Sequence, residues 1–200
     1  MRGLYLVTPD DADTERLRRR VDRVLGHAAM LQYRNKAATR DERRAQVEAL
    51  LPVCRGLGVP LVVNDDWRLA RECGADGAHL GRDDGELGQA RRACGDTMIL
   101  GASCYDDLAR ARAAAAAGAT YVAFGAFFPS PTKPLASRAS PRLLRESEPL
   151  GLPRVAIGGI RPENVPSLVA AGADLVAVIS GVFDAPDPEA AARAYRAGFE

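Results

Sequence analysis

The sequence predicts an α/β fold: a single (β/α)8 barrel with minimal insertions, in which residues 1–200 form one domain. Three similar segments, starting at Cys73, Ala117 and Ala171, support this prediction. In each, a glycine closes a helical stretch before a short turn and a buried strand. Repetition of such helix–strand joints indicates a parallel sheet. The length leaves little room for a second domain or an inserted lid.

Eight strand segments and eight helix segments alternate along the chain, which is the count of such a barrel. Apolar, β-prone residues predict strands over residues 3–8, 30–34, 60–64, 77–80, 98–103, 121–124, 154–157 and 175–179. Helices are predicted over residues 14–27, 39–57, 66–73, 85–94, 105–117, 140–148, 162–171 and 187–199. The first helix shows the pattern clearly, because Leu17, Val21, Val24 and Leu25 form an apolar stripe. A doubly wound open sheet is the competing architecture, but no Gly-x-Gly-x-x-Gly motif follows the first strand.

The composition excludes several classes of function. Lys and Arg total 27 and Asp and Glu total 26, so no overall positive field would recruit nucleic acid. The four cysteines are scattered without a Cys-x-x-Cys pair, and three fall in predicted helices, which indicates buried thiols in a reducing compartment. The chain starts directly with a predicted strand and holds no apolar run long enough to span a membrane. We therefore expect a cytoplasmic protein without membrane partners.

Polar residues collect where the predicted strands end, which is the face that carries the active site in barrels of this kind. Strand two runs into Gln32, Arg34 and Lys36, which are two residues apart and therefore point the same way. Strand three ends in Asn64 and Asp65. The next aspartate along the chain has a simpler role, because it is placed to cap the following helix.

The predicted strands four and five add further polar groups to this face. Strand four is followed by Asp83 and Asp84, of which one is expected to cap the next helix while the other stays available. Strand five ends in Ser103. His79 lies within strand four, and two interpretations remain open for it: a hydrogen-bonded core histidine, or a catalytic group.

The connection after strand six, residues 125–139, is unusually long for such a barrel. Its aromatic residues and prolines argue against disorder. Ser130, Thr132 and Lys133 supply two hydroxyls and a cation, which suit phosphate oxygens. A proline-stiffened surface loop is the simpler alternative.

Two separate anion sites are expected from these residues. Gly158 and Gly159 follow strand seven and Ser180 follows strand eight, which matches the usual monophosphate site of these barrels. Near strands two to four, Asp65 and Asp84 would repel a phosphate directly. Their presence is explained by Mg²⁺, which typically takes one or two carboxylates together with phosphate oxygens.

Together these motifs resemble the thiamine phosphate synthase family, also called thiamine-phosphate pyrophosphorylase. The resemblance covers nearly the whole chain. It is carried by Gln32-x-Arg34-x-Lys36, Asn64-Asp65, His79-x-Gly81-x-x-Asp84, Gly101-x-Ser103, Gly125 through Pro129-Ser130-x-Thr132-Lys133, Ala156-Ile157-Gly158-Gly159-Ile160 and Val178-Ile179-Ser180. It implies a TIM-barrel transferase of thiamine biosynthesis. Such an enzyme joins 4-amino-2-methyl-5-hydroxymethylpyrimidine diphosphate to 4-methyl-5-(2-phosphoethyl)thiazole, or its carboxylated form, and releases pyrophosphate.

The resemblance also implies a role for each matching residue. Mg²⁺ would be the cofactor, bound by Asp65 and Asp84. Gln32 would contact the pyrimidine. The pyrophosphate would be held by Arg34, Lys36, Asn64, Ser103 and Lys133, of which all but Asn64 are also candidate catalytic residues. The thiazole phosphate would be received by Ser130, Thr132, Gly159, Ile179 and Ser180. The family's reaction is dissociative: pyrophosphate leaves, a pyrimidine-stabilised carbocation forms, and the thiazole nitrogen attacks it.

The sequence departs from the family pattern at two places, and three other functions remain as alternatives. Arg82 stands where the family usually has Gln, and residues 134–140 lack a glycine often found before helix six. A related thiazole tautomerase would carry a histidine near Ala126. A sugar-phosphate isomerase or indole-type barrel would leave the acids and cations without a shared task, and a phosphate-ligand sensor would bind without turnover. We expect small-molecule substrates, no nucleic acid partner, and a chain compatible with a homo-oligomer.

Overall fold

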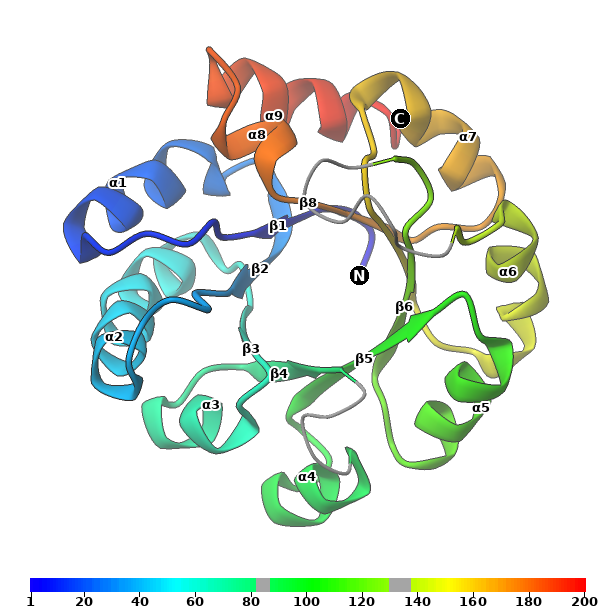
Figure 1. Ribbon diagram of the computed structural model, residues 1–200, viewed down its shortest axis with the longest axis horizontal. Helices are drawn as coiled ribbons and strands as arrows, with labels where there is room; N and C mark the ends of the chain where they lie inside the picture. Colours follow the sequence, from blue (N-terminus) through cyan, green and yellow to red (C-terminus); the bar gives the residue numbers. More distant parts are fainter. Residues whose placement is uncertain (82–86, 130–137) are drawn as a thin grey trace.

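The computed structural model describes residues 1–81, 87–129 and 138–200. Eight parallel strands follow one another in chain order around a closed barrel (Figure 1). The strands are β1 (Gly3–Val7), β2 (Ala28–Tyr33), β3 (Leu61–Asn64), β4 (Gly77–Leu80), β5 (Ile99–Tyr105), β6 (Tyr121–Gly125), β7 (Arg154–Ile157) and β8 (Leu175–Val178). The predicted fold, a (β/α)8 TIM barrel, is therefore confirmed.

Helices surround the barrel and alternate with the strands (Figure 1). They are α1 (Thr14–Leu25), α2 (Arg40–Leu57), α3 (Trp67–Cys73), α4 (Leu87–Cys94), α5 (Leu108–Ala116), α6 (Pro141–Glu146), α7 (Val165–Ala170), α8 (Ser180–Phe183) and α9 (Pro188–Ala197). Two 3-10 turns, η1 (Glu148–Leu150) and η2 (Pro162–Asn164), flank β7. Among the described residues, no helix is both long enough and apolar enough to cross a membrane.

The three repeated segments have a common structural task at the start of the strands. After α3, the carboxylate of Asp76 accepts a 2.8 Å hydrogen bond from the backbone N–H of Leu61. After α7, the carboxylate of Asp174 accepts a bond of the same length from the N–H of Arg154. After α5, the hydroxyl of Thr120 does the same for Leu100. Each joint thereby ties a new strand to the beginning of its neighbour, which fixes the register.

Helix starts follow the capping residues that the sequence offers. Asp13, Asp66, Asp107 and Asp187 each accept a backbone N–H of the first turn of a helix. Thr39 forms a reciprocal capping box with Glu42 at the start of α2. These side chains satisfy N–H groups that have no partner within the helix.

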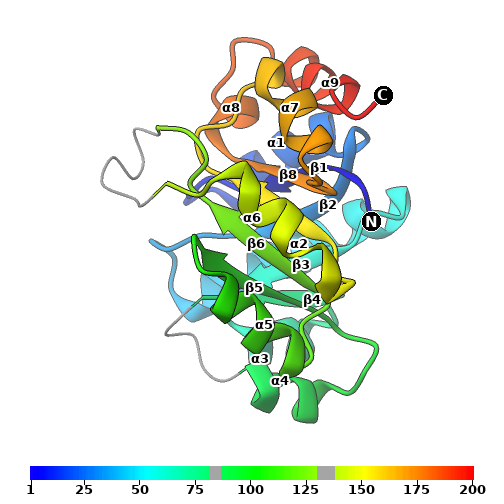
Figure 2. The same cartoon turned by 90° about the vertical axis from the view of Figure 1, so that its right-hand side faces the viewer.

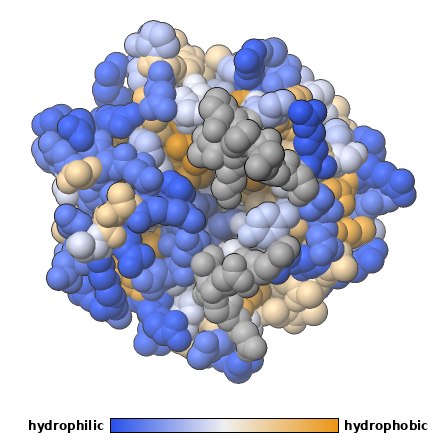
Figure 3. All heavy atoms as spheres, viewed as in Figure 1, coloured by the Kyte–Doolittle hydropathy of each residue, from blue (hydrophilic) through white to orange (hydrophobic). Residues whose placement is uncertain are grey.

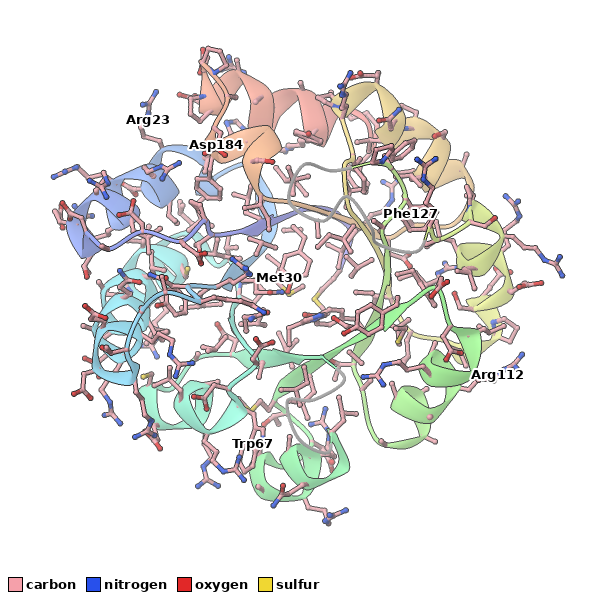
Figure 4. All side chains as sticks on the ribbon, in the orientation of Figure 1. Arg23, Met30, Trp67, Arg112, Phe127 and Asp184 are labelled. Carbon is pink, nitrogen blue, oxygen red and sulfur yellow. The ribbon has the colours of Figure 1, made fainter. Side chains whose placement is uncertain are left out.

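Two apolar clusters hold the barrel together. One lies between the strands and the helices, and Trp67 of α3 belongs to it. The other fills the barrel interior and includes Tyr5, Met30 and Tyr121. Figure 4 shows Met30 near the barrel axis and Trp67 outside the strands. Inner and outer side chains alternate along each strand, as a pleated sheet requires.

The element boundaries differ from the prediction in two informative places. We predicted that a helix starts at residue 105, but β5 continues to Tyr105, whose φ of 55° ends the strand. The helix starts only after Asp107, because that carboxylate caps it. The short helix α8 after β8 was also missed, since its four residues carry no side-chain cap.

Candidate functional site

The C-terminal ends of the strands share one face of the barrel. Figure 2 shows this face on one side of the molecule and the N-terminus on the other. Figures 1 and 3 look onto it, and Figure 3 shows hydrophilic side chains gathered over the side formed by α1 and α2. The residues predicted for the site from β2, β3, β5, β7 and β8 all lie at these strand ends. The topology therefore brings them together.

The end of β2 alternates between the barrel interior and the helix layer, as predicted. Gln32 points inward, because its Nε2 donates a 2.6 Å hydrogen bond to the hydroxyl of Tyr5. Tyr33 and Asn35 point to the other side, where both bond to Gln46 of α2. The buried outward residues anchor the strand end, so the intervening positions face the mouth of the barrel.

Arg34 and Lys36 meet an acid that the sequence analysis missed. Asp10, in the loop after β1, accepts a 3.0 Å hydrogen bond from the guanidinium of Arg34. The same carboxylate oxygen accepts the backbone N–H of Lys36 at 2.8 Å. The sequence signal was available, because Asp10 follows a strand end like the other candidates. Asp10 thus fixes both the Arg34 side chain and the backbone beyond it.

Asp65 lies beside Lys36, its neighbour across the strand ends. The ammonium nitrogen of Lys36 is 3.7 Å from Oδ2 of Asp65. The backbone of Asp65 has a φ of 65°, and its N–H donates to the carbonyl of His79 on the adjacent strand. A pocket of about 280 Å³ opens here. Its lining residues are Tyr33, Asn35, Lys36, Ala38, Arg43, Asn64 and Asp65.

Metal-binding capacity in the described part of the chain is limited. Residues 1–81, 87–129 and 138–200 contain no group of three or more His, Cys, Asp or Glu side chains that could hold a metal ion. Asp65 offers a carboxylate that is 34% exposed at the pocket. A hard cation bound to Asp65 would need further oxygen ligands from groups other than the described His, Cys, Asp and Glu side chains.

Ser103 ends a chain of buried side chains rather than standing alone. Its hydroxyl oxygen lies 2.8 Å from Nε2 of His79, whose Nδ1 lies 2.9 Å from the hydroxyl of Tyr121. His79 is only 7% exposed, so its interpretation as a hydrogen-bonded core residue is confirmed. Sequence reasoning missed Tyr121, although a buried tyrosine hydroxyl ordinarily needs a partner.

The glycines after β7 have a packing role that the sequence analysis did not foresee. Gly158 and Gly159 both have positive φ, at 101° and 61°. A Cβ at Gly158 would overlap Ala126, and one at Gly159 would overlap the carbonyl oxygen of Pro129. The segment after β6 therefore packs directly on this turn, and the N–H of Phe128 donates to the carbonyl of Gly158.

Some of the remaining candidate residues lie within the part of the chain that the structure describes, and others lie outside it. Ile179 packs against the inner cluster, and Ser180 is the first residue of α8. Cys104 lies near the end of β5, but its side chain belongs to the outer cluster between strands and helices. Four of the predicted site residues lie outside the described ranges: Asp84, Ser130, Thr132 and Lys133. Arg82 lies outside them as well.

Comparisons with known proteins agree with this arrangement. Residues 4–182 match the family described as thiamine monophosphate synthase. The thiamine-phosphate synthase of Xanthomonas campestris pv. campestris strain 8004 is 60% identical over 198 residues, which cover 99% of this chain and 96% of the relative. That of Xylella fastidiosa strain Temecula1 is 50% identical over 198 residues, covering 99% of this chain and 85% of the relative.

A solved structure shows the same architecture. The thiamine phosphate pyrophosphorylase from Pyrococcus furiosus superposes with a TM-score of 0.86 at 30% identity, covering 98% of this chain and 95% of that one. A match of this extent spans the barrel from its first strand to its last helices. The chain therefore belongs to the thiamine monophosphate synthase family.

Proposed function

We propose that this protein is a thiamine phosphate synthase. It would join 4-amino-2-methyl-5-hydroxymethylpyrimidine diphosphate to 4-methyl-5-(2-phosphoethyl)thiazole, or the carboxylated thiazole, and release pyrophosphate. The observation that carries the proposal is the pairing of Lys36 with Asp65 at one rim of the barrel, 3.7 Å apart. The ammonium group that would bind the diphosphate and the carboxylate that would bind its metal ion must act on the same leaving group. The short distance between Lys36 and Asp65 allows this.

The chain's own residues would act by binding and positioning. Arg34 and Lys36 follow β2 and would bind the diphosphate oxygens, together with Asn64 at the end of β3, which lines the same pocket as Lys36. Ser103 would donate its hydroxyl to the same group. Lys133, outside the described residues, is proposed to complete this set. Separation of charge during departure of pyrophosphate would be stabilised by these fixed donors, so no protein nucleophile is required.

Mg²⁺ is proposed as the cofactor on the chemistry of its ligands. Asp65 presents a partly exposed carboxylate at the pocket that Lys36 and Asn64 also line. One or two carboxylates, completed by phosphate oxygens and water, are a typical Mg²⁺ environment. Asp65 would hold the ion together with Asp84. When bound, the ion would neutralise charge on the leaving pyrophosphate.

The thiazole phosphate is proposed to bind on the opposite part of the rim. Gly159 and Ser180 lie at the ends of β7 and β8, where phosphate groups commonly bind in these barrels. Ile179 packs on the inner cluster beneath this position and would contact the substrate from the barrel side. Ser130 and Thr132 would add hydroxyl donors.

One assay tests the proposal directly. Purified protein is given both substrates, with Mg²⁺ or with excess chelator, and pyrophosphate release is followed. We expect release only when both substrates and Mg²⁺ are present. Tight binding of thiamine phosphate without turnover would instead indicate a ligand sensor. Conversion of the thiazole substrate alone, without pyrophosphate release, would indicate the tautomerase alternative.

A further inference from the structure

Five side chains from five strands form one continuous series of hydrogen bonds across the barrel interior, here called the relay: Gln32, Tyr5, Tyr121, His79 and Ser103. Nε2 of Gln32 donates to the hydroxyl of Tyr5 at 2.6 Å, and that hydroxyl lies 2.8 Å from the hydroxyl of Tyr121. The Tyr121 hydroxyl lies 2.9 Å from Nδ1 of His79, and Nε2 of His79 lies 2.8 Å from Oγ of Ser103. One end is Gln32, which the family resemblance implies contacts the pyrimidine, and the other is Ser103, which is proposed to bind the diphosphate.

The relay places polar side chains in the barrel interior, which apolar side chains ordinarily fill. Tyr5 and Tyr121 are at most 1% exposed and meet edge to face, with ring centroids 5.9 Å apart. His79 stacks on Tyr121. A Cβ at Gly101 would overlap the Tyr121 ring, so this glycine makes the space that the ring occupies. Met30 lies in the same inner cluster, near the barrel axis (Figure 4).

At any moment all hydrogen bonds of the relay run in the same donor-to-acceptor direction. Burial raises the pKa of both Tyr5 and Tyr121, so each keeps its single proton. Each hydroxyl therefore donates to one neighbour and accepts from the other, and a neutral imidazole has one donor and one acceptor nitrogen. Because Gln32 donates to Tyr5, the bonds run from Gln32 through Tyr121 to Ser103.

This direction determines what the two ends offer to a ligand. Ser103 accepts from Nε2 of His79, which leaves the serine hydroxyl proton to be donated at the mouth. Gln32 has its Nε2 engaged, which leaves Oε1 as an acceptor. If the amide were reversed, Tyr5 would donate to Gln32 and every bond would reverse. Ser103 would then donate to His79 and present only lone pairs, which repel a phosphate oxygen.

We propose that Tyr5, Tyr121 and His79 are positioning residues that couple recognition of the pyrimidine amino group at Gln32 to the donor state of Ser103. The inference rests on the proposed function. An amino group donates to Oε1 of Gln32 and maintains the direction that makes Ser103 a donor to the diphosphate. A carbonyl group at the same ring position requires the reversed amide and turns Ser103 into an acceptor. The relay thus selects 4-aminopyrimidine over 4-oxopyrimidine diphosphates.

A double-mutant cycle measures this coupling. Gln32→Met and Ser103→Ala are made singly and together, and KM and kcat for the 4-aminopyrimidine diphosphate are determined by pyrophosphate release. The cycle is repeated in Tyr121→Phe and in Tyr5→Phe, which cut the relay at different links by removing one oxygen. Tyr195→Phe is the matched control, because it removes a buried hydroxyl that bonds to the backbone of Ile160. Thermal unfolding checks that each variant is folded.

The results separate the relay from the proposed function. We expect about five- to tenfold coupling in kcat/KM between Gln32 and Ser103 in the wild-type and Tyr195→Phe backgrounds, and none in either relay-cutting variant. The preference for the amino over the oxo substrate should fall by the same factor in Tyr121→Phe or Tyr5→Phe. Coupling that persists in a folded Tyr5→Phe or Tyr121→Phe protein would overturn the relay alone. Absence of pyrophosphate release from wild-type protein would overturn the proposed function, and the relay with it.

Discussion

The ammonium nitrogen of Lys36 lies 3.7 Å from Oδ2 of Asp65, although the two residues belong to the ends of different strands. Their side chains are 60% and 34% exposed. Exposed ion pairs contribute only about 0–1 kcal/mol. Exchange of this pair for a metal–carboxylate contact and a lysine–diphosphate contact therefore costs little. The pair holds both groups at the rim without resisting the proposed substrate complex.

Asp65→Asn tests the proposed metal ligand. The amide keeps the shape of the side chain but removes its negative charge, so Mg²⁺ should bind more weakly. We expect the Mg²⁺ concentration for half-maximal activity to rise by about tenfold or more, since loss of even an outer-shell partner of a metal ligand typically costs about 10–100-fold in affinity. The measurement is pyrophosphate release as a function of Mg²⁺ concentration.

Asp66→Asn is the control for this substitution. It makes the same charge change one residue further along, where the side chain caps α3. Asn caps helices about as well as Asp, so stability and Mg²⁺ dependence should both be retained. An unchanged Mg²⁺ requirement in Asp65→Asn would remove Asp65 from the metal site.

Asp10→Asn should strengthen pyrophosphate binding. The amide oxygen can still accept the N–H of Lys36, but the negative charge facing Arg34 at 3.0 Å is lost. Because the pair is partly exposed, the gain should be about 1 kcal/mol or less, which is up to about fivefold in affinity. Calorimetric titration with pyrophosphate and Mg²⁺ measures it. Weaker binding would show that Asp10 acts chiefly by orienting Arg34.

The strands and the rim residues were predictable from local patterns. Buried β-prone runs fixed the strands, and Gln32, Arg34 and Lys36 followed from side-chain alternation at the end of β2. The relay was not predictable in this way. Tyr5 and Tyr121 are 116 residues apart, and their contact exists only because β1 and β6 face each other across the closed barrel. Arg43 likewise reaches the pocket from α2, and no periodicity in the sequence marks that direction.

The glycines at the end of β7 show a second limit of sequence reasoning. Their position predicted close approach of a phosphate, whereas the residues that approach them in the structure are Ala126, Phe128 and Pro129. A glycine pair reports that something comes near the backbone, but it does not distinguish a ligand from another segment of the chain. The proposed phosphate contact at Gly159 therefore stays a prediction.

Lys133→Ala should lower kcat by about 10²–10³. The lysine is proposed to stabilise negative charge that develops on the departing pyrophosphate, so its loss affects the transition state more than substrate binding. Steady-state kinetics should therefore show a fall in kcat with a smaller change in KM. Lys133→Arg should recover part of the rate. Wild-type turnover in the alanine variant would contradict the assignment.

Asp174→Ala should destabilise the barrel without altering kcat. Its carboxylate accepts the N–H of Arg154 at 2.8 Å and the Nε of the same residue at 3.1 Å. The residue lies before β8, at the barrel end opposite the site. Loss of both bonds should lower the free energy of unfolding by about 1–3 kcal/mol. Urea unfolding measures this, and Asp174→Asn should recover part of the loss because an amide oxygen can still accept a hydrogen bond.

Two buried thiols should make the protein less stable at alkaline pH. Burial raises the pKa of both Cys54 and Cys104 to about 12, whereas an unfolded thiol ionises near pH 8.5. Between these values the folded state holds more protons than the unfolded state. Stability is therefore fully retained below about pH 8.5 and falls as pH rises toward 12. The expected slope is about 1.4 kcal/mol per pH unit for each thiol once the unfolded thiol is ionised.

Urea unfolding at pH 7, 8.5 and 9.5 tests this dependence below about pH 10, where unfolded tyrosines ionise and the buried tyrosines begin to contribute. The double variant Cys54→Ala, Cys104→Ala should be less stable at pH 7, because both side chains pack in the outer cluster. Its stability should nevertheless change less between pH 8.5 and 9.5 than that of the wild type. Cys94→Ala is the matched control, since it also removes a thiol but Cys94 is only partly buried, and the slope should remain close to that of the wild type. An equal slope in the double variant and the wild type would show that other groups cause the alkaline loss.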